Sequence, residues 1–179
     1  MHNRKLTRLS GFDYSENRNY FLTICVYDHM GSFGSIVNKS MKLTNDGIIA
    51  MEQWYWLGNQ YPYIDLISFV IMPDHVHGII YIHTDFFKHY VGIVDNNVEN
   101  GRDRSLHINP DRSPQSIHVI PKIKPLPELI GAYKTTVSKR IHMSGNTDIK
   151  WQKSYYEHII RNQRSLIFIK HYIETNPEH

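Results

Sequence analysis

The sequence predicts an α+β fold in which helices pack on the faces of one antiparallel β-sheet. Two apolar runs that are rich in β-branched and aromatic residues, 20–27 and 64–72, are typical of buried strands. The Pro73-Asp74 step after the second run leads into a further strand at 77–82, and so short a connection indicates a hairpin. Strands that follow one another directly, with helices between the groups, favour an antiparallel sheet over a parallel one.

The first half of the chain also contains two short strands and a helix. The strands are expected at 33–37 and 41–43. Thr44 or Asn45 can cap a helix whose apolar residues recur at helical spacing, and Gly58 is expected to end that helix.

The second half begins with a polar stretch and ends with two helices. Residues 84–120 are rich in turn formers and lack a period, so a long loop or insertion is predicted there. A helix with a proline in its first turn is expected at 125–141, a segment that is part strand and part loop at 151–160, and a last helix, capped by Asn162, at 163–175. No repeat divides the chain, and all 179 residues are predicted to form a single domain.

The composition indicates a cytoplasmic protein without a membrane span. No apolar stretch reaches the ~18 residues that a spanning helix needs, and the lone cysteine, Cys25, is expected to be a buried small hydrophobe. The net charge of +3 divides into −2 over residues 1–120 (10 Lys and Arg against 12 Asp and Glu) and +5 over 121–179 (10 against 5). The basic C-terminal third suits a polyanionic partner, although scattered surface lysines would give the same count.

The segment Met72-Pro-Asp-His-Val-His-Gly78 carries the most chemical information. On a strand, residues two apart point to the same face, so His75 and His77 present two imidazoles side by side. Such a pair offers two ligands to a metal ion. The chain has 12 histidines, so a chance pair is the alternative interpretation.

A second candidate site lies near the C-terminus. Residues four apart share one face of a helix, so Tyr172 and Asn176 are expected to point the same way. The amide oxygen of Asn176 suits a hard divalent ion, and the Tyr172 hydroxyl would then lie beside it. The alternative is that Tyr172 packs in the core and Asn176 only ends the helix.

Residues 151–162 mix aromatic side chains with cations, in the order Trp-Gln-Lys-Ser-Tyr-Tyr-Glu-His-Ile-Ile-Arg-Asn. Aromatic faces beside cations suit single-stranded nucleic acid, because bases stack on the rings and cations attract the phosphates. A packed aromatic corner is the alternative interpretation.

Together and in this order, the three segments resemble the REP-associated tyrosine transposases, a branch of the single-tyrosine HUH (IS200-like) transposases. HUH denotes His, a bulky hydrophobic residue and His, here His75-Val76-His77. The likeness runs over residues 11–177. It implies a single HUH, ferredoxin-like domain that acts as a metal-dependent single-stranded DNA endonuclease and strand transferase in DNA transposition and recombination.

The resemblance also implies roles for individual residues. Those that match the family's metal ligands are His75, His77 and Asn176. Tyr172 matches the nucleophile. Tyr155 and Tyr156 are alternative nucleophiles, because they lie in another motif of the family, but only Tyr172 has an asparagine four residues on.

The implied chemistry is a transesterification with Mg²⁺ or Mn²⁺ as cofactor. Three neutral ligands leave the ion most of its charge, which offsets the charge developing on the phosphate. Attack by tyrosine on phosphorus gives a 5′-phosphotyrosine link and a free 3′-OH, so rejoining needs no ATP. The side chains considered as the base for the phenolic proton are Glu157, His158 and His171.

The implied partner is single-stranded or hairpin DNA, with no membrane contact, and a homodimer is left open. The cations expected to contact phosphates are Arg4, Lys5, Arg8, Lys134, Lys139, Arg140, Lys153 and Arg161.

Two other functions are alternatives. The chain could hold hairpin DNA or RNA without cutting it, or it could be a metal-dependent phosphodiester hydrolase that uses water. Tyr172→Phe separates the tyrosine mechanism from the water mechanism, since it removes only the first. A structural protein with a chance His pair would bind no metal.

Overall fold

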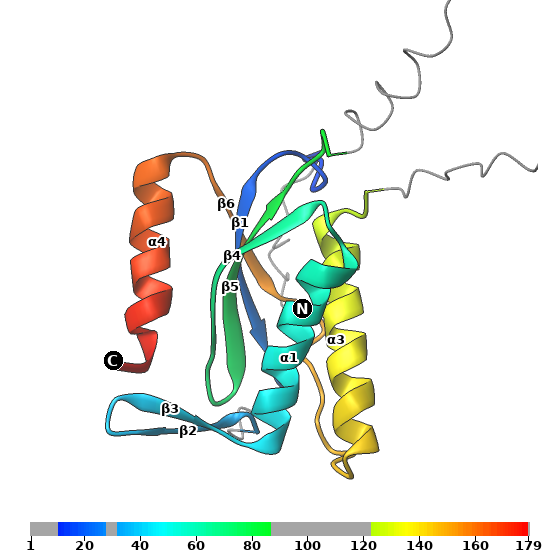
Figure 1. Cartoon of the computed structure of the whole chain (residues 1–179), viewed down its shortest axis with the longest axis vertical. Coiled ribbons are helices and arrows are strands. Elements are labelled where there is room, and N and C mark those ends of the chain that lie inside the picture. The colour runs from blue at the N-terminus through cyan, green and yellow to red at the C-terminus, as the bar shows by residue number, and fades with distance from the viewer. Residues whose placement is uncertain (1–10, 28–31, 87–122, 179) are drawn as a thin grey trace, which may run out of the picture.

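The computed structural model describes residues 11–27, 32–86 and 123–178 (Figure 1). The elements are β1 (Asn19–Cys25), β2 (Gly34–Val37), β3 (Ser40–Leu43), α1 (Asn45–Gln60), β4 (Ile64–Ile71), β5 (His75–Ile82), α3 (Leu126–Met143), β6 (Tyr156–Ile160), α4 (Gln163–Thr175) and the 3-10 helix η1 (Asn176–Glu178). The predicted α+β class is confirmed. Within the described ranges, no helix combines the length and the apolar character that crossing a membrane requires. Most of the predicted loop at 84–120, and the cations Arg4, Lys5 and Arg8, lie outside the described residues.

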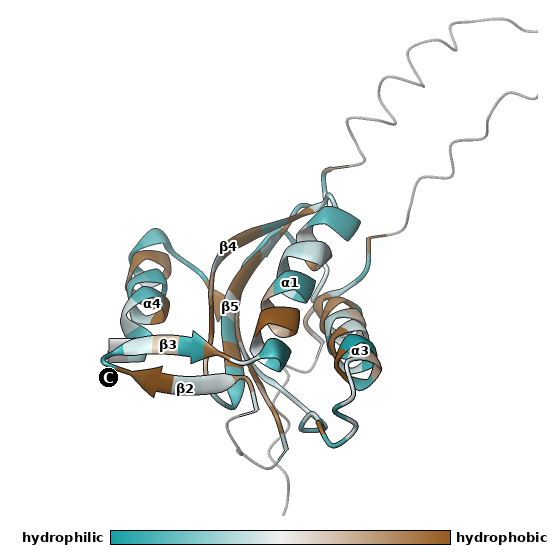
Figure 2. Ribbon diagram, turned by 60° about the horizontal axis from the view of Figure 1, so that its bottom comes forward, coloured by the Kyte–Doolittle hydropathy of each residue, from teal (hydrophilic) through white to brown (hydrophobic). Residues whose placement is uncertain are grey.

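Four strands form one antiparallel sheet in the order β4-β5-β1-β6. The hairpin predicted from Pro73-Asp74 is the β4–β5 pair. Strand β6 comes from the last third of the chain and pairs with β1, so it forms the edge of the sheet opposite to β4. The separate β2–β3 hairpin extends below the sheet, beside the C-terminal end of α4 (Figures 1 and 2).

Helices cover the two faces of the sheet unequally. Helices α1 and α3 lie on one face and α4 lies alone on the other (Figure 1). The α1/α3 face carries the main core, with Trp54 and Tyr133 fully buried, and Figure 2 shows β4 and β5 as largely hydrophobic between the two helix layers. Helix α4 is held more lightly, because its only fully buried side chain is Ile173, which packs with Ile79 and Ile160.

Strand alternation decides which side chains reach the face that α4 covers. The even-numbered residues of β1 enter the main core, so Phe21, Thr23 and Cys25 are left on the α4 face. The even-numbered residues of β5 do the same, so His75 and His77 lie on the α4 face as well. The expectation for Cys25 was wrong: it is half-buried, because it points to the lightly covered face.

The predicted cap of the first helix is confirmed and its predicted end is wrong. The Thr44 side chain accepts a hydrogen bond from the Gly47 N–H, but α1 continues past Gly58 to Gln60. Gly58 permits close packing rather than ending the helix, since a Cβ there would lie 2.9 Å from Cδ1 of Leu66.

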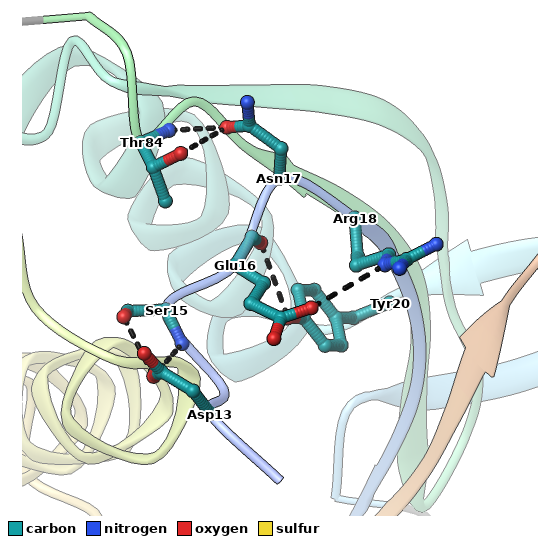
Figure 3. Close-up of polar contacts among 7 residues, drawn as sticks. All are labelled: Asp13, Ser15, Glu16, Asn17, Arg18, Tyr20 and Thr84. Atoms are coloured by element: carbon teal, nitrogen blue, oxygen red, sulfur yellow. Dashed lines mark hydrogen bonds and ion pairs between the residues drawn. The ribbon is translucent and has the colours of Figure 1, made fainter.

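The segment that leads into β1 is tied to the residues after β5. Oδ1 of Asn17 accepts hydrogen bonds from the N–H and the hydroxyl of Thr84 (Figure 3). The Tyr20 hydroxyl donates to the carbonyl of Glu16 at 3.2 Å, and the Glu16 carboxylate pairs with Arg18 at 3.6 Å. The Asn17–Thr84 contacts hold the segment before β1 against the residues after β5, and the other two contacts order that segment locally.

Candidate active site on the α4 face

His75 and His77 face each other, as the strand parity predicted. Their Nε2 atoms lie 3.1 Å apart. Each ring is held at its other nitrogen: Nδ1 of His75 lies 2.6 Å from Oδ1 of Asp74, and Nδ1 of His77 lies 2.9 Å from Oγ1 of Thr23. A carboxylate only accepts, so Nδ1 of His75 is the donor, and in the neutral form of the ring the lone pair is on Nε2.

His77 is buried, with 6% of its surface exposed. Its pKa is lowered to about 4, first by burial and then by the neighbouring His75, while the backbone of Leu22 and the Asp74 carboxylate act in the opposite direction. His77 is therefore neutral near pH 7, which is the form of imidazole that binds a metal ion.

Helix α4 brings Tyr172 to the His pair. The Tyr172 hydroxyl lies 3.4 Å from Nε2 of His77, and the two ring centroids are 5.4 Å apart. The ring of Phe21 contacts both, at 5.4 Å from His77 and 6.3 Å from Tyr172. Tyr172 is 44% exposed, so it does not pack in the core and a substrate can approach it from solution.

Asn176 lies where α4 passes into η1, with helical backbone angles (φ −55, ψ −40). It is partly buried and follows Tyr172 by one helical turn. In the part of the chain that the structure describes, no three His, Cys, Asp or Glu side chains form a metal-binding group. The amide oxygen of Asn176 is of a type that suits a hard divalent ion.

The spacing of the two imidazoles fits a divalent ion. Two nitrogens that bind one ion at about 2.1 Å lie about 3.0 Å apart at the right angle of octahedral geometry and about 3.4 Å apart at the tetrahedral angle. The observed 3.1 Å between the Nε2 atoms falls within this range, and it is also an ordinary hydrogen-bond distance between two imidazoles. The hydrogen bonds at both Nδ1 atoms are also typical of metal-binding histidines, because they fix the ring orientation.

The two alternative nucleophiles differ in their exposure. Tyr155 is buried in the main core, with its ring 5.7 Å from Nζ of Lys134. Tyr156 is 55% exposed on the α4 face, and its Cα pairs with that of Thr23. Of the three tyrosines, Tyr172 is the one whose hydroxyl contacts the His pair.

The side chains considered as a base do not gather around Tyr172. Glu157 alternates with Tyr156 along β6 and is buried on the main-core side, so this expectation was wrong for Glu157. His158 is exposed on β6 and pairs with Phe21, and His171 is exposed on α4.

The described cations expected to contact phosphates fall into two groups. Lys139 and Arg140 lie on α3, which covers the opposite face, and Arg140 pairs with Glu52 at 3.1 Å. Lys153 and Arg161 are exposed on either side of β6. Lys134 belongs to the α3 group as well, but it is partly buried and its ammonium donates to two backbone carbonyls.

Sequence reasoning assigned no role to three contributors to the site, namely Asp74, Thr23 and Phe21. Asp74 directly precedes His75, so a carboxylate partner for that imidazole was readable from the sequence. Thr23 and Phe21 lie on a strand more than fifty residues away, and their contacts with His77 follow from the β1–β5 register.

Comparison with known proteins gives the fold a precedent. No family model matches the chain. An uncharacterized protein of Haemophilus influenzae is 29% identical over 177 residues, which cover 99% of this chain and 89% of the relative. Among solved structures, the REP-associated tyrosine transposase bound to a REP hairpin aligns with a TM-score of 0.52 at 17% identity, over 95% of this chain and 70% of that one. The chain therefore has the fold of that transposase.

Proposed function

We propose that this protein is a transposase of the REP-associated, single-tyrosine type, which cuts and rejoins single-stranded DNA next to hairpins. The observation that carries the proposal is the hydroxyl of Tyr172 at 3.4 Å from Nε2 of His77, with His75 Nε2 a further 3.1 Å away. An exposed nucleophile beside two pre-oriented imidazoles suits metal-assisted attack on a phosphodiester.

The shared fold supports DNA as the substrate, because the transposase of the same fold was solved with a REP hairpin. The basic C-terminal third of this chain, with +5 over residues 121–179, agrees with a polyanionic partner. Lys153 and Arg161 are the exposed cations nearest in sequence to β6, which is the edge strand next to β1. We propose that these two cations contact the DNA backbone.

The divalent ion would be held by His75, His77 and Asn176. When bound, Mg²⁺ or Mn²⁺ supplies Lewis-acid polarisation of a phosphate oxygen. Asp74 and Thr23 orient the two imidazoles toward the site through their Nδ1 atoms. These two side chains are positioning residues.

Tyr172 performs the covalent step. Its phenolic oxygen bonds to phosphorus, the P–O3′ bond breaks, and O3′ leaves and takes a proton. The phenolic proton passes to water, which reaches the half-exposed ring. The product is a 5′-phosphotyrosine and a free 3′-OH, and attack of a 3′-OH on that link restores a phosphodiester and the tyrosine without an external energy source.

The test is a covalent adduct. The protein, a Tyr172→Phe variant and a Tyr55→Phe control are incubated with Mn²⁺ and a partly randomised pool of labelled hairpin oligonucleotides with single-stranded flanks. Tyr55 is a suitable control because it is similarly exposed, at 54%, but lies on α1 on the opposite face. We expect a denaturant-resistant protein–DNA adduct for the wild type and the control, none for Tyr172→Phe, and none in EDTA.

Mass spectrometry of the adduct identifies the nucleophile. A phosphotyrosine at 155 or 156 would overturn the assignment of Tyr172 and keep the reaction. Cleavage that persists in Tyr172→Phe would instead support a water-using hydrolase, and tight binding by the wild type without any adduct would support a binding module.

A further inference from the structure

We infer that a hollow beside the His pair binds one unstacked nucleobase of the substrate strand, and that the ring of Tyr156 is its stacking face. The inference rests on the proposed function and names a substrate subsite for it. The residues that line this hollow, called here the β6 hollow, are Thr23, Cys25, Gln152, Ser154, Tyr155 and Tyr156.

The β6 hollow lies one strand away from the His pair. Thr23 pairs with His77 and Cys25 with His75 in the β1–β5 register, and all four side chains are on the α4 face. Adjacent strands are about 4.8 Å apart. Thr23 connects the His pair to the β6 hollow, because its hydroxyl is hydrogen-bonded to His77 and the residue also lines the hollow. A base next to a phosphate at the His pair is therefore within reach of the hollow.

Tyr156 has the exposure and the setting of a stacking residue. It is 55% exposed, although it lies on the sheet face beneath α4, and it makes a T-shaped contact with Phe21 at a centroid distance of 6.4 Å. Bases stack on such rings in single-stranded DNA complexes, largely irrespective of sequence. The same Phe21 ring contacts His77 and Tyr172, so one aromatic cluster joins the stacking face to the reacting groups.

Lys134 holds one wall of the β6 hollow in place, namely the wall formed by Gln152 and Ser154. Its ammonium donates to the carbonyls of Gln152 at 2.9 Å and Ser154 at 3.3 Å, and it lies over the rings of Trp151 and Tyr155. The N–H of Gln152 also donates to the carbonyl of Cys25 at 2.9 Å. The wall is therefore tied to both α3 and β1, which favours a preformed binding surface over one that must order on binding.

The size and chemistry of the β6 hollow suit one base. Its volume is about 210 Å³, below the roughly 300 Å³ at which pockets for drug-sized ligands begin. A flat ring fits such a space better than a whole nucleotide. The hydroxyls of Thr23 and Ser154 and the amide of Gln152 can each donate and accept hydrogen bonds at a base edge. Lys153 is exposed between Gln152 and Ser154 in the sequence, and its positive charge would attract the phosphates of the bound DNA strand.

The test measures binding and accessibility separately from cleavage. Binding of the fluorescent hairpin pool is measured for Tyr172→Phe and for the same protein with Tyr156→Ala, Tyr156→Phe or Tyr55→Ala added. We expect Tyr156→Ala to weaken binding about fivefold to a hundredfold, the range for loss of one stacked base. Tyr156→Phe keeps the ring and should stay within about twofold, as should the Tyr55→Ala control. Metal affinity should be unchanged in all of them, which shows that the site is intact.

Cys25 gives a second readout, because it is the only cysteine of the chain and lines the β6 hollow. Alkylation of its thiol by N-ethylmaleimide should slow severalfold when the oligonucleotide pool saturates the protein. Unchanged affinity of Tyr156→Ala, or alkylation of Cys25 that DNA does not slow, would overturn the base subsite while the Tyr172 adduct still stands. A wild-type adduct mapped to Tyr156 would also overturn it. Failure of the wild type to bind or react with the pool would remove the proposed function and this inference together.

Discussion

The Tyr172 hydroxyl lies 3.4 Å from Nε2 of His77, although 95 residues separate the two positions in the sequence. His77 is fixed in the middle of the sheet, on β5 between β4 and β1. Tyr172 is carried by α4, which buries a single side chain completely. The geometry of the candidate site therefore depends on how firmly one lightly packed helix is held against a rigid sheet.

Loss of the α4 anchor should impair the reaction even though Tyr172 is intact. Ile173 is fully buried against Ile79 and Ile160, and Ile173→Ala should cost about 2–5 kcal/mol of unfolding free energy. Adduct formation, measured below the unfolding transition, should fall at least tenfold because α4 no longer holds the hydroxyl in place. Ile167→Ala is the matched control, since Ile167 is 61% exposed on the same helix. Equal adduct rates for both variants would contradict this account of α4.

Removal of the groups that orient the imidazoles should weaken metal binding. Asp74→Asn and Thr23→Val each disturb a hydrogen bond to an Nδ1 atom, and loss of such partners typically costs 10- to 100-fold in metal affinity. Mn²⁺ titration by calorimetry gives the affinity directly. Thr23→Ser keeps the hydroxyl and should bind nearly as the wild type does. His83→Ala, at the far end of the same face, should have no effect, and a loss of affinity there would point to a different site.

The metal-free protein should lose stability as the pH falls from about 6.5 toward 4. The pKa of His77 is lowered from its ordinary 6.5 to about 4 in the folded state, so the unfolded chain takes up this proton first. Above pH 6.5 His77 is neutral in both states and no stability is lost. The loss of unfolding free energy grows as the pH falls and reaches about 3 kcal/mol once His77 is protonated in both states. Urea unfolding in EDTA at pH 7.5, 6 and 5 measures it. His77→Gln should show a flatter dependence, and an identical slope would show that His77 does not titrate in this way.

Gly78 is expected to tolerate no side chain. A Cβ at this position would lie 2.3 Å from Cζ2 of the fully buried Trp54. Gly78→Ala should therefore destabilise the protein by about 1–3 kcal/mol through overpacking, and it should also lower metal affinity, because β5 carries the neighbouring His77. Gly131→Ala on α3 has open space within 4 Å and should stabilise by about 1 kcal/mol through helix propensity. Denaturant unfolding of the two variants should give opposite signs.

Much of this fold follows from local patterns. The alternation along residues 20–27 and 64–72 predicted the strands, and Thr44 and Asn162 predicted two helix starts, since both positions provide side-chain caps in the structure. Helix α1 was predicted too short, because a glycine signals either a stop or a close contact and only the position of Leu66 in space distinguishes the two.

The sequence by itself determined which side chains share a face. His75 and His77 had to lie together because a strand repeats every two residues. The helical repeat of about four predicts in the same way that Tyr172 and Asn176 point in one direction. Only the tertiary structure decided that Tyr172, and neither Tyr155 nor Tyr156, contacts the His pair, and that Thr23 holds the His77 ring. The repeat of an element is a property of its own backbone, whereas the distance between β5 and α4 is set by side chains from several strands packing against Ile173, and no local pattern contains that information.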